Sequence, residues 1–521
     1  MKVSSTYFVF LIILFLGIAS TAFGQKKSKL KLLGAEKMVY DEEAHGKVRI
    51  LQGNVRFKQN SSLMYCDSAV LYSETNSMKA FGNVKIIDSR KKTEMRGDSL
   101  IYNGNTKKGK LRGKVTFISE SQILETRHLD FNTQTDVAQY YGGGHIINTD
   151  DQSELDSKIG YYYSSTKSFF FKDSVKYITK DYEIYSDTME YDGNEDIVYF
   201  HGPTRMYGDS SSILCSSGWY NKKTKLSTFS KDVVIESDGQ VLKSDSVIYH
   251  QESKTGEAFG SVEILDTTNN TQVNGDYAKY DNIKKKSVVS GHIELVLIFS
   301  EDSLYLHSDT MYTDYDPTNT HRLIHAYNRV QFYKSDLQGK CDSLTFSEVD
   351  STIRMFVTPV VWIDSNQVTG KEIVIKTYDG VIQNMQIFEE AFMVSEEDSA
   401  LYNQVKGKSL YAHFKNNEIY RIDVNRSGQT IYYVRDENQE LMGMNRLDCS
   451  NMSIYVDSLG INNIKFFKQP DGTFHPMKEV KPDMQILRHF YWRIDERPAK
   501  REDIFHWKEV PERIAKRSKG K

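Results

Sequence analysis

The side chains that could do chemistry in this sequence recur at a fixed spacing, and the first set is a series of aspartates. Each follows a glycine, serine or cysteine. Calcium needs several carboxylates gathered around one ion, whereas repeats two strands apart would separate these carboxylates by about 9–10 Å. We therefore interpret them as acceptors for backbone amides at a bend of the chain. The aspartates are Asp67, Asp98, Asp187, Asp245, Asp276, Asp309 and Asp342.

Four cysteines and a pair of histidines form the second set. Cys66, Cys215 and Cys341 occupy equivalent positions several repeats apart, too far from one another for a disulfide. We interpret them as small buried residues. His321 and His325 are four residues apart, but no glutamate base accompanies them as in a zinc protease. The sequence predicts no metal site and no cofactor.

The motifs of common enzyme classes are missing from the sequence. It contains no phosphate-binding loop, no nucleophile elbow and no dinucleotide fingerprint. Sixty-seven basic and 70 acidic residues give a net charge of -3, with no basic stripe to bind nucleic acid. The 33 tyrosines and 26 phenylalanines can form a core, which argues against disorder. We expect a binding or structural protein and not an enzyme.

Two alternating signatures position these residues, and together they define a repeat of about 30 residues. The first is a Gly-x-Val-x-apolar run, as at residues 53–57 and 82–86, and most of its copies are 29 or 31 residues apart. The second spans residues 95–102 and returns at 242–249. Both alternate apolar and polar residues, which is the period of a half-buried strand.

The second signature contains a phase slip. Before Asp98 the predicted inward residues are Met95 and Gly97, and after it they are Leu100 and Tyr102. A strand that bends from one sheet into another needs an extra residue at the corner, as a bulge does. A small residue lets the backbone turn, and the aspartate can accept the amides freed there.

Polar turn clusters, such as residues 88–92 and 103–109, lie between the signatures. Each repeat then holds two hairpin turns and two corners, and its four strand segments are shared by two facing sheets. The predicted fold is all-β: an elongated antiparallel β-jellyroll solenoid of about 30-residue repeats. A membrane barrel is disfavoured because both faces of many strands carry charge.

The two ends of the chain differ from the repeats. Residues 1–24 combine a basic start, an apolar core and small residues before Gln25, so we expect a cleaved signal peptide. An uncleaved membrane anchor is the alternative. We expect the repeats to fill residues 25–375, an irregular β-rich region to fill 376–480, and a charged and aromatic cap and tail to fill 481–521.

The Gly-x-Val runs at 53–55 and 82–84, alternating with Asp-Ser at 67–68 and 98–99, resemble the OstA-type, LptA-like family of lipopolysaccharide transport proteins. The resemblance covers about residues 30–375. It implies a periplasmic antiparallel β-jellyroll, open along one edge, whose apolar interior carries the acyl chains of lipid A from the inner to the outer membrane. The chain is far longer than a minimal family member. Three roles stay open: a mobile bridge, a fused bridge, or part of an outer-membrane receptor.

The inward side chains are the candidates for contact with lipid. Each buried methylene of an acyl chain contributes about 0.8 kcal/mol without any polar contact. The same side chains could instead pack a dry core. The candidates are Val55, Phe57, Val84, Ile86, Leu100, Tyr102, Val115, Phe117, Met189, Tyr191, Val247, Tyr249, Val262 and Ile264.

From the resemblance we expect a periplasmic lipopolysaccharide-binding transport protein that bridges the inner and outer membranes, in association with the outer membrane. The expected partners are lipopolysaccharide, through lipid A, and membrane-bound lipopolysaccharide transport components, through exposed edge strands. The alternative is a structural or adhesive β-solenoid that binds protein or glycan on its outer face. A fully packed core would favour the alternative, and an open seam would favour lipid transport.

Overall fold

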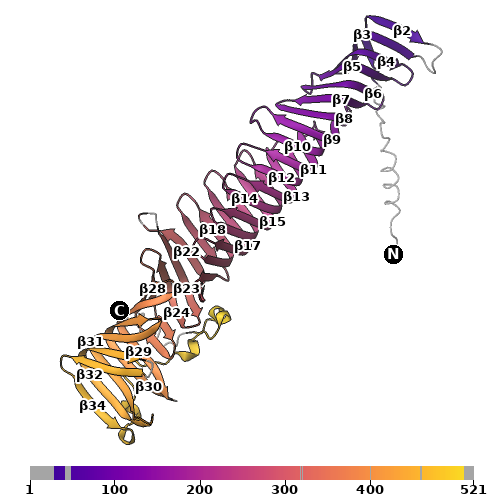
Figure 1. Ribbon diagram of the computed structural model, residues 1–521. Coiled ribbons are helices and arrows are strands. Elements are labelled where there is room, and N and C mark those ends of the chain that lie inside the picture. Colours follow the sequence, from indigo (N-terminus) through magenta and orange to yellow (C-terminus); the bar gives the residue numbers. More distant parts are fainter. Residues whose placement is uncertain are drawn as a thin grey trace, which may run out of the picture. The chain divides into compact units, whose positions relative to one another are not determined.

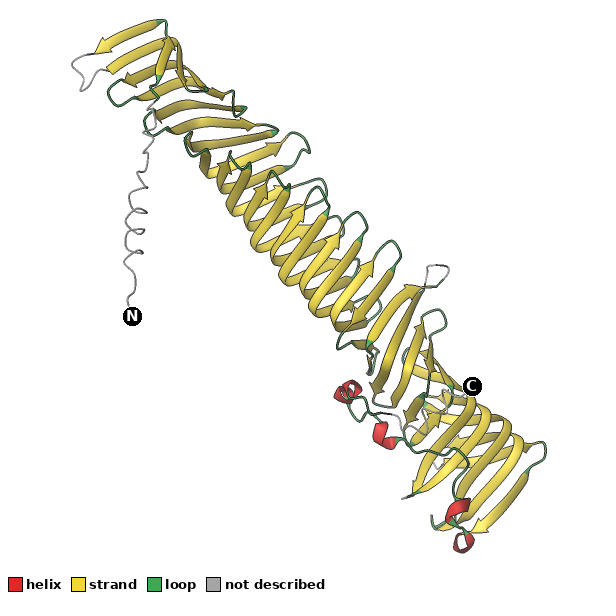
Figure 2. Cartoon of the chain, turned by 180° about the vertical axis from the view of Figure 1, so that it is seen from behind, coloured by secondary structure: helices red, strands yellow, loops and turns green. Residues whose placement is uncertain are grey.

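The computed structural model describes residues 28–41, 48–316, 318, 321–398, 400–457 and 460–509. The predicted signal peptide, residues 1–24, lies outside the described residues. Strands dominate the described chain, and the short helices lie near its C-terminal end (Figures 1 and 2). None of the helices in these residues has the length and apolar character needed to cross a membrane.

The first compact unit consists of the described residues up to 180, together with residues 190–194. From β3 to β11, each strand pairs antiparallel with its neighbours in the chain. Strands β1 and β2 pair with the two halves of β3. The strands are β1 (Lys31–Gly34), β2 (Lys37–Asp41), β3 (Val48–Gln59), β4 (Ser62–Tyr72), β5 (Ser77–Asp88), β6 (Thr93–Asn103), β7 (Lys108–Ser119), β8 (Gln122–Asn132), β9 (Val137–Asn148), β10 (Glu154–Tyr163) and β11 (Ser168–Ile178).

The second unit consists of residues 181–189 and the described residues from 195 to 509, so β12 (Glu183–Asp192) has residues in both units. From β13 to β18 the strands again pair in chain order. The remaining strands are β13 (Ile197–Tyr207), β14 (Ser211–Asn221), β15 (Leu226–Ser237), β16 (Gln240–His250), β17 (Thr255–Asp266), β18 (Thr271–Asp281), β19 (Lys286–Ser290), β20 (Glu294–Ile298), β21 (Ser303–His307), β22 (Thr310–Tyr315), β23 (Arg322–Lys334), β24 (Leu337–Ser347), β25 (Thr352–Phe356), β26 (Val360–Ile363), β27 (Asn366–Thr369), β28 (Glu372–Tyr378), β29 (Val381–Asp398), β30 (Leu401–Lys415), β31 (Glu418–Arg435), β32 (Leu441–Asp457), β33 (Gly460–Phe467) and β34 (Asp471–Pro476). Four short 3₁₀ helices follow: η1 (Met477–Glu479), η2 (Pro482–Met484), η3 (Ile494–Glu496) and η4 (Arg501–Phe505).

Each long strand bends once near its middle, and this corner folds the sheet onto itself. The register between β5 and β6 shifts at Gly82 and Asn83, which have positive φ of 72° and 42°. Such a left-handed pair inserts extra residues into one strand and bends it. We call the sheet that contains residues 77–81 of β5 sheet I, and the sheet that contains residues 84–88 sheet II. In later repeats the corner interrupts the strand, so that β18 pairs separately with β19 and β20.

Side chains from sheets I and II meet in the interior. The rings of Phe117, from sheet II, and Tyr162, from sheet I, have centroids 5.6 Å apart. Met95 and Leu100, on either side of the Asp98 corner, are both buried, so the predicted phase slip is observed. The predicted all-β antiparallel jellyroll with two facing sheets is confirmed within each unit, where the strands stack in chain order. The domain boundaries at residues 375 and 480 stay a prediction.

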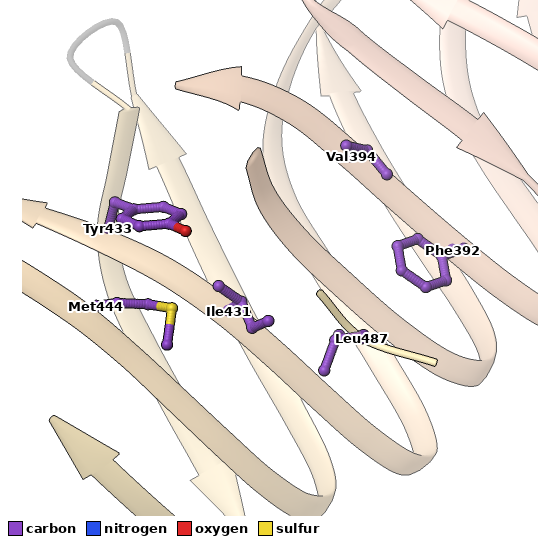
Figure 3. Packing of buried hydrophobic residues seen from close by; sticks show 6 residues of the cluster. All are labelled: Phe392, Val394, Ile431, Tyr433, Met444 and Leu487. Atoms are coloured by element: carbon purple, nitrogen blue, oxygen red, sulfur yellow. The ribbon is translucent and has the colours of Figure 1, made fainter. Parts of the chain in front are cut away.

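Residues 477–508, which we call the strap, cover the outer face of sheet II in the second unit. Leu487 of the strap lies among outward-facing side chains of β29, β31 and β32 (Figure 3). Along β29 these alternate with Ala391 and Met393, which face the interior. Without the strap, this apolar face would be exposed to water. The side chains around Leu487 are Phe392, Val394, Ile431, Tyr433 and Met444.

Glutamines on the outer face of sheet II hold the strap backbone. Gln404 donates a 2.7 Å hydrogen bond to the carbonyl of Gln485 and accepts a 2.9 Å bond from the amide of Leu487. Gln367 makes the same two contacts with the strap further along, at 2.8 and 2.6 Å. A glutamine side chain thus takes the place of an edge strand, because its amide offers both a donor and an acceptor.

A buried ion group fixes the C-terminal half of the strap. Glu496 lies 2.8 Å from Lys340 Nζ and 2.7 Å from Arg493 Nη2, and the side chains of Lys340, Arg493 and Glu496 are 0%, 3% and 7% exposed. Lys340 also lies over the ring of Trp507, 4.0 Å from its centroid. One carboxylate therefore neutralises two cations that the strap removes from water.

The change Glu496→Gln would leave Lys340 and Arg493 as buried cations without a carboxylate. We expect the free energy of unfolding of the second unit to fall by about 3–5 kcal/mol, and proteolysis within the strap to become faster. Urea denaturation and limited proteolysis measure the two effects. The control is Glu389→Gln, which breaks the exposed 2.9 Å pair with Lys371 and should cost less than about 1 kcal/mol. Equal small losses in both variants would contradict the role of the ion group.

The same group predicts how the strap responds to pH. Burial raises the pKa of Glu496, but the hydrogen bonds and charges of Arg493 and Lys340 outweigh burial and leave the pKa below its ordinary value. A lowered carboxyl pKa contributes stability that is complete above the ordinary value and is lost as pH falls through the folded value. We expect strap proteolysis to stay slow from neutral pH down to about pH 4, the ordinary carboxyl range, and to rise below it. A rise already near neutral pH would contradict this assignment.

Candidate functional site

The structure places all fourteen predicted interior residues on the inward faces of the sheets. Eleven are buried, and Tyr191, Tyr249 and Ile264 are half-buried. Val84, Val115 and Val262 occupy equivalent positions next to a corner, as the sequence indicates. The structure therefore brings the candidates of each unit together in an apolar interior, and their contact with lipid stays a prediction.

The edge opposite the corners is where hairpin turns of the two sheets meet, and we call it the seam. The turns of sheet I form one lip of the seam, and the turns of sheet II form the other. In the first unit, side chains from the two lips contact each other across the seam. Gln59 of sheet II donates a 3.0 Å hydrogen bond to the carbonyl of Gly104 and accepts one from Tyr102 Oη at 2.5 Å. Glu120 pairs with Lys167 at 2.8 Å. Each pair joins residues about 45 apart in the chain.

We call these cross-seam contacts latches. Lys91 forms an ion pair with Asp136, and the hydroxyls of Ser119 and Tyr162 lie 3.1 Å apart. Sequence reasoning missed the latches because each is a single polar pair between distant turns. Their common spacing of 43 to 47 residues is the signal that could have revealed them.

The interior of the first unit is filled mainly by its own side chains. A cavity of about 20 Å³ remains, enough for roughly one water molecule. Its lining is almost wholly apolar, so it offers dispersion contacts and no reactive group. An acyl chain would enter only if the sheets moved apart at the seam. The lining includes Phe117, Leu124, Leu129, Tyr140, Ile146 and Phe171.

Within each unit, aromatic side chains lie on the seam side of sheet I, one from each repeat. Tyr102 and Phe131 stack with centroids 6.2 Å apart, and Phe169 packs between Tyr162 and Tyr191. A tyrosine suits this position because its ring can lie in the interior while its hydroxyl reaches the polar rim. The members are Tyr102, Phe131, Tyr162, Tyr191, Tyr220, Tyr249 and Tyr280, at steps of 29 or 31 residues.

The recurrent aspartates lie at the corners, as predicted. Asp98 Oδ2 accepts a 3.0 Å hydrogen bond from the amide of Lys114 at the next corner, and Asp67 Oδ2 accepts one of 2.8 Å from Asn83. A Cβ atom on Gly82 would lie only 2.4 Å from Asp67 Oδ2, so glycine is required beneath the carboxylate. In the part of the chain that the structure describes, no three potential metal ligands gather.

The four cysteines and His325 lie in strands of the sheets. All four cysteines are free and buried. Burial raises the pKa of the Cys66 and Cys215 thiols to about 11, which suppresses the reactive thiolate. His325 lies 3.3 Å from Asp314 and 3.2 Å from Thr345, within the sheet.

Comparisons with known proteins give two matching family models. The model described as OstA-like protein matches residues 27–187 and 230–305. The model described as LptA/(LptD N-terminal domain) LPS transport protein matches residues 272–381. Among the curated proteins, none matches the chain.

Seventeen chains of solved structures match. One is LptH from Pseudomonas aeruginosa, described as the LptA homologous periplasmic component of the conserved lipopolysaccharide transport device. It is 16% identical, the match covers 20% of this chain and 79% of LptH, and the TM-score is 0.20.

Removing a corner carboxylate should weaken the first unit without affecting its interior. We expect Asp98→Ala to lower its free energy of unfolding by about 1 kcal/mol, the usual scale for one hydrogen bond. Arg127 occupies the same repeat position in β8 and is exposed. Arg127→Ala should therefore change the free energy of unfolding of the first unit by less than about 0.5 kcal/mol. Urea denaturation gives both values. Lipid binding lost from a folded Asp98→Ala protein would show that the carboxylate has a further role.

Proposed function

Because the chain belongs to the OstA-like, LptA-like family of lipopolysaccharide transport proteins, we propose that it carries lipopolysaccharide across the periplasm between the inner and outer membranes. The acyl chains of lipid A lie between sheets I and II. The observation that carries this proposal is the interior: two apolar faces held together by backbone at the corners and, in the first unit, by single polar latches at the seam.

This architecture suits a hydrocarbon cargo. When an acyl chain enters between the sheets, contacts between the two sheets are replaced by contacts between each sheet and the acyl chain. Each methylene taken from water contributes about 0.8 kcal/mol, and no polar recognition is needed along the chain. The repeats offer equivalent surfaces in series, such as Val84, Val115 and Val262, so the cargo meets a similar environment at each step.

The partners in this proposal follow from the free strand edges. β2 pairs with β3 on one side, and no strand of the described chain pairs with its other edge. Its Met38, Val39 and Tyr40 are exposed. An unpaired strand edge can accept a strand from another chain. We propose that membrane-bound lipopolysaccharide transport components dock in this way, in the periplasm, to which the predicted signal peptide would direct the chain.

One observation favours the structural or adhesive solenoid as a second candidate. The cavity between the sheets in the first unit is only about 20 Å³, and one of the same size lies in the second unit between Leu295, Leu306 and Ile324. A permanently closed core would leave only the outer face for binding. The two functions therefore differ in whether the interior accepts lipid.

A charged residue in the interior should distinguish lipid transport from a closed solenoid. Val115→Glu places an unpaired ion between the sheets, which is costly in an apolar passage. We expect bound lipopolysaccharide, measured by mass spectrometry of the purified protein, to fall several-fold while neighbouring repeats preserve the fold. The matched control is Thr116→Glu, on the opposite side of the same strand, which should bind lipid normally.

A photo-crosslinking residue tests the same point in cells. Positions 84, 115 and 262 face the interior and should capture lipopolysaccharide, whereas positions 85, 116 and 263 face outward and should not. Equal capture from both faces would contradict an internal path. Unfolding of the Val115→Glu protein, together with no capture from any inward position, would favour the dry-core solenoid.

A further inference from the structure

Apolar inward residues of the second unit are partly exposed to solvent along one stretch of the seam. From β14 to β18, the inward residues nearest the seam, such as Ile235, Tyr249 and Ile264, are half-buried. Their equivalents early in the first unit, Ile86, Tyr102 and Phe117, are buried, and Tyr102 is only 1% exposed. Tyr162, Tyr177 and Tyr191, at the far end of that unit, are half-buried as well. Tyr280 at the end of this stretch is 48% exposed. Apolar side chains of both sheets therefore reach the surface here.

Latches are missing from two pairs of facing turns in the described part of this stretch. By the spacing of about 45 residues seen in the first unit, turn 208–211 faces turn 251–254, and turn 237–240 faces turn 282–285. Among the described residues, neither pair of turns forms a hydrogen bond or ion pair across the seam. The next latch joins Asp266 and Arg322 at 3.5 Å. The two lips of this stretch are therefore not fastened to each other by polar contacts.

The lip that belongs to sheet I is basic here. Its turns at residues 251–254 and 281–286 hold four lysines and two acidic residues. The facing turns of sheet II, at 208–211 and 237–240, hold no lysine and two aspartates. Successive turns on one lip are about 10 Å apart, two strand spacings. The lysines are Lys254, Lys284, Lys285 and Lys286.

We propose that this stretch of seam is the opening through which an anionic lipid enters or leaves the interior. Its acyl chains pass between the tyrosines of sheet I and the aliphatic residues of sheet II, and its phosphate groups bind the lysines of the lip. The occupant follows from two features in one place, an exposed apolar slot and a cationic rim. A neutral lipid would make no charge contact with the rim, and a hydrophilic anion would leave the apolar slot exposed.

Lysines at such a rim contribute electrostatic attraction that weakens with salt. Lys254 is exposed, and Lys284 keeps a side chain 71% exposed despite its 3.0 Å pair with Asp281. Lys285 lies 5.4 Å from the ring centroid of Tyr315. The inference rests on the proposed function and adds to it a place of entry and a charge requirement.

Crosslinking from matched positions tests the opening. A photo-crosslinking residue at 235, 249 or 264 in the full-length protein should capture purified lipopolysaccharide several-fold more efficiently than one at 86, 102 or 117, its equivalents in the first unit. Equal yields from the two sets would contradict the opening while leaving the proposed function intact. No capture from either set would contradict the proposed function itself.

Charge removal tests the rim. We expect the combined change Lys254→Gln, Lys284→Gln and Lys285→Gln to lower capture from position 249 several-fold at low salt. The control, Lys107→Gln with Lys108→Gln, alters a turn on the same lip in the first unit and should leave capture from position 249 unchanged. Lipopolysaccharide from which the phosphates have been removed should be captured equally by the rim variant and by the protein with the original lysines, both carrying the photo-crosslinking residue at position 249. Undiminished capture of intact lipopolysaccharide by the rim variant would contradict the phosphate contact.

Discussion

The corner in the middle of each strand is the constraint from which the architecture of both units follows. A pair of left-handed residues, such as Gly82 and Asn83, bends the strand and shifts the phase of its side chains. Both halves of one strand can then bury their apolar faces against each other. At each corner the backbone runs without a break from sheet I into sheet II, so the corner edge of each unit stays closed. Opening or closing of the interior therefore depends on the seam.

The repeat made the corner and the interior predictable from sequence. The slip at Asp98 located the bend, and the alternation on either side of it identified inward residues that the structure buries. Those inferences succeed because they depend on the local alternation of apolar and polar residues, which recurs in every repeat. The aspartate series was interpretable for the same reason: a carboxylate that recurs singly, beside a small residue, is placed to accept an amide.

Other features could not be predicted because they depend on pairing between distant segments. The strap binds Gln367 and Gln404, whose sequence positions give no indication of a covering segment, and its ion group joins Lys340 to a residue 156 positions away. The seam is similar. Its latches are single polar pairs between turns. In the described chain they are absent between turns 208–211 and 251–254 and between turns 237–240 and 282–285, which becomes informative only once the fold shows which turns face each other.

The central claim is that the interior holds lipid, and mass spectrometry of the protein purified from the periplasm tests it most directly. The account predicts that lipopolysaccharide copurifies with the folded protein and is released when the protein is unfolded. The proposed opening near Tyr249 and Ile264 would give the cargo a way in without unfolding. Folded protein that is free of lipid, and stays so when incubated with lipopolysaccharide, would contradict the account and favour a closed solenoid.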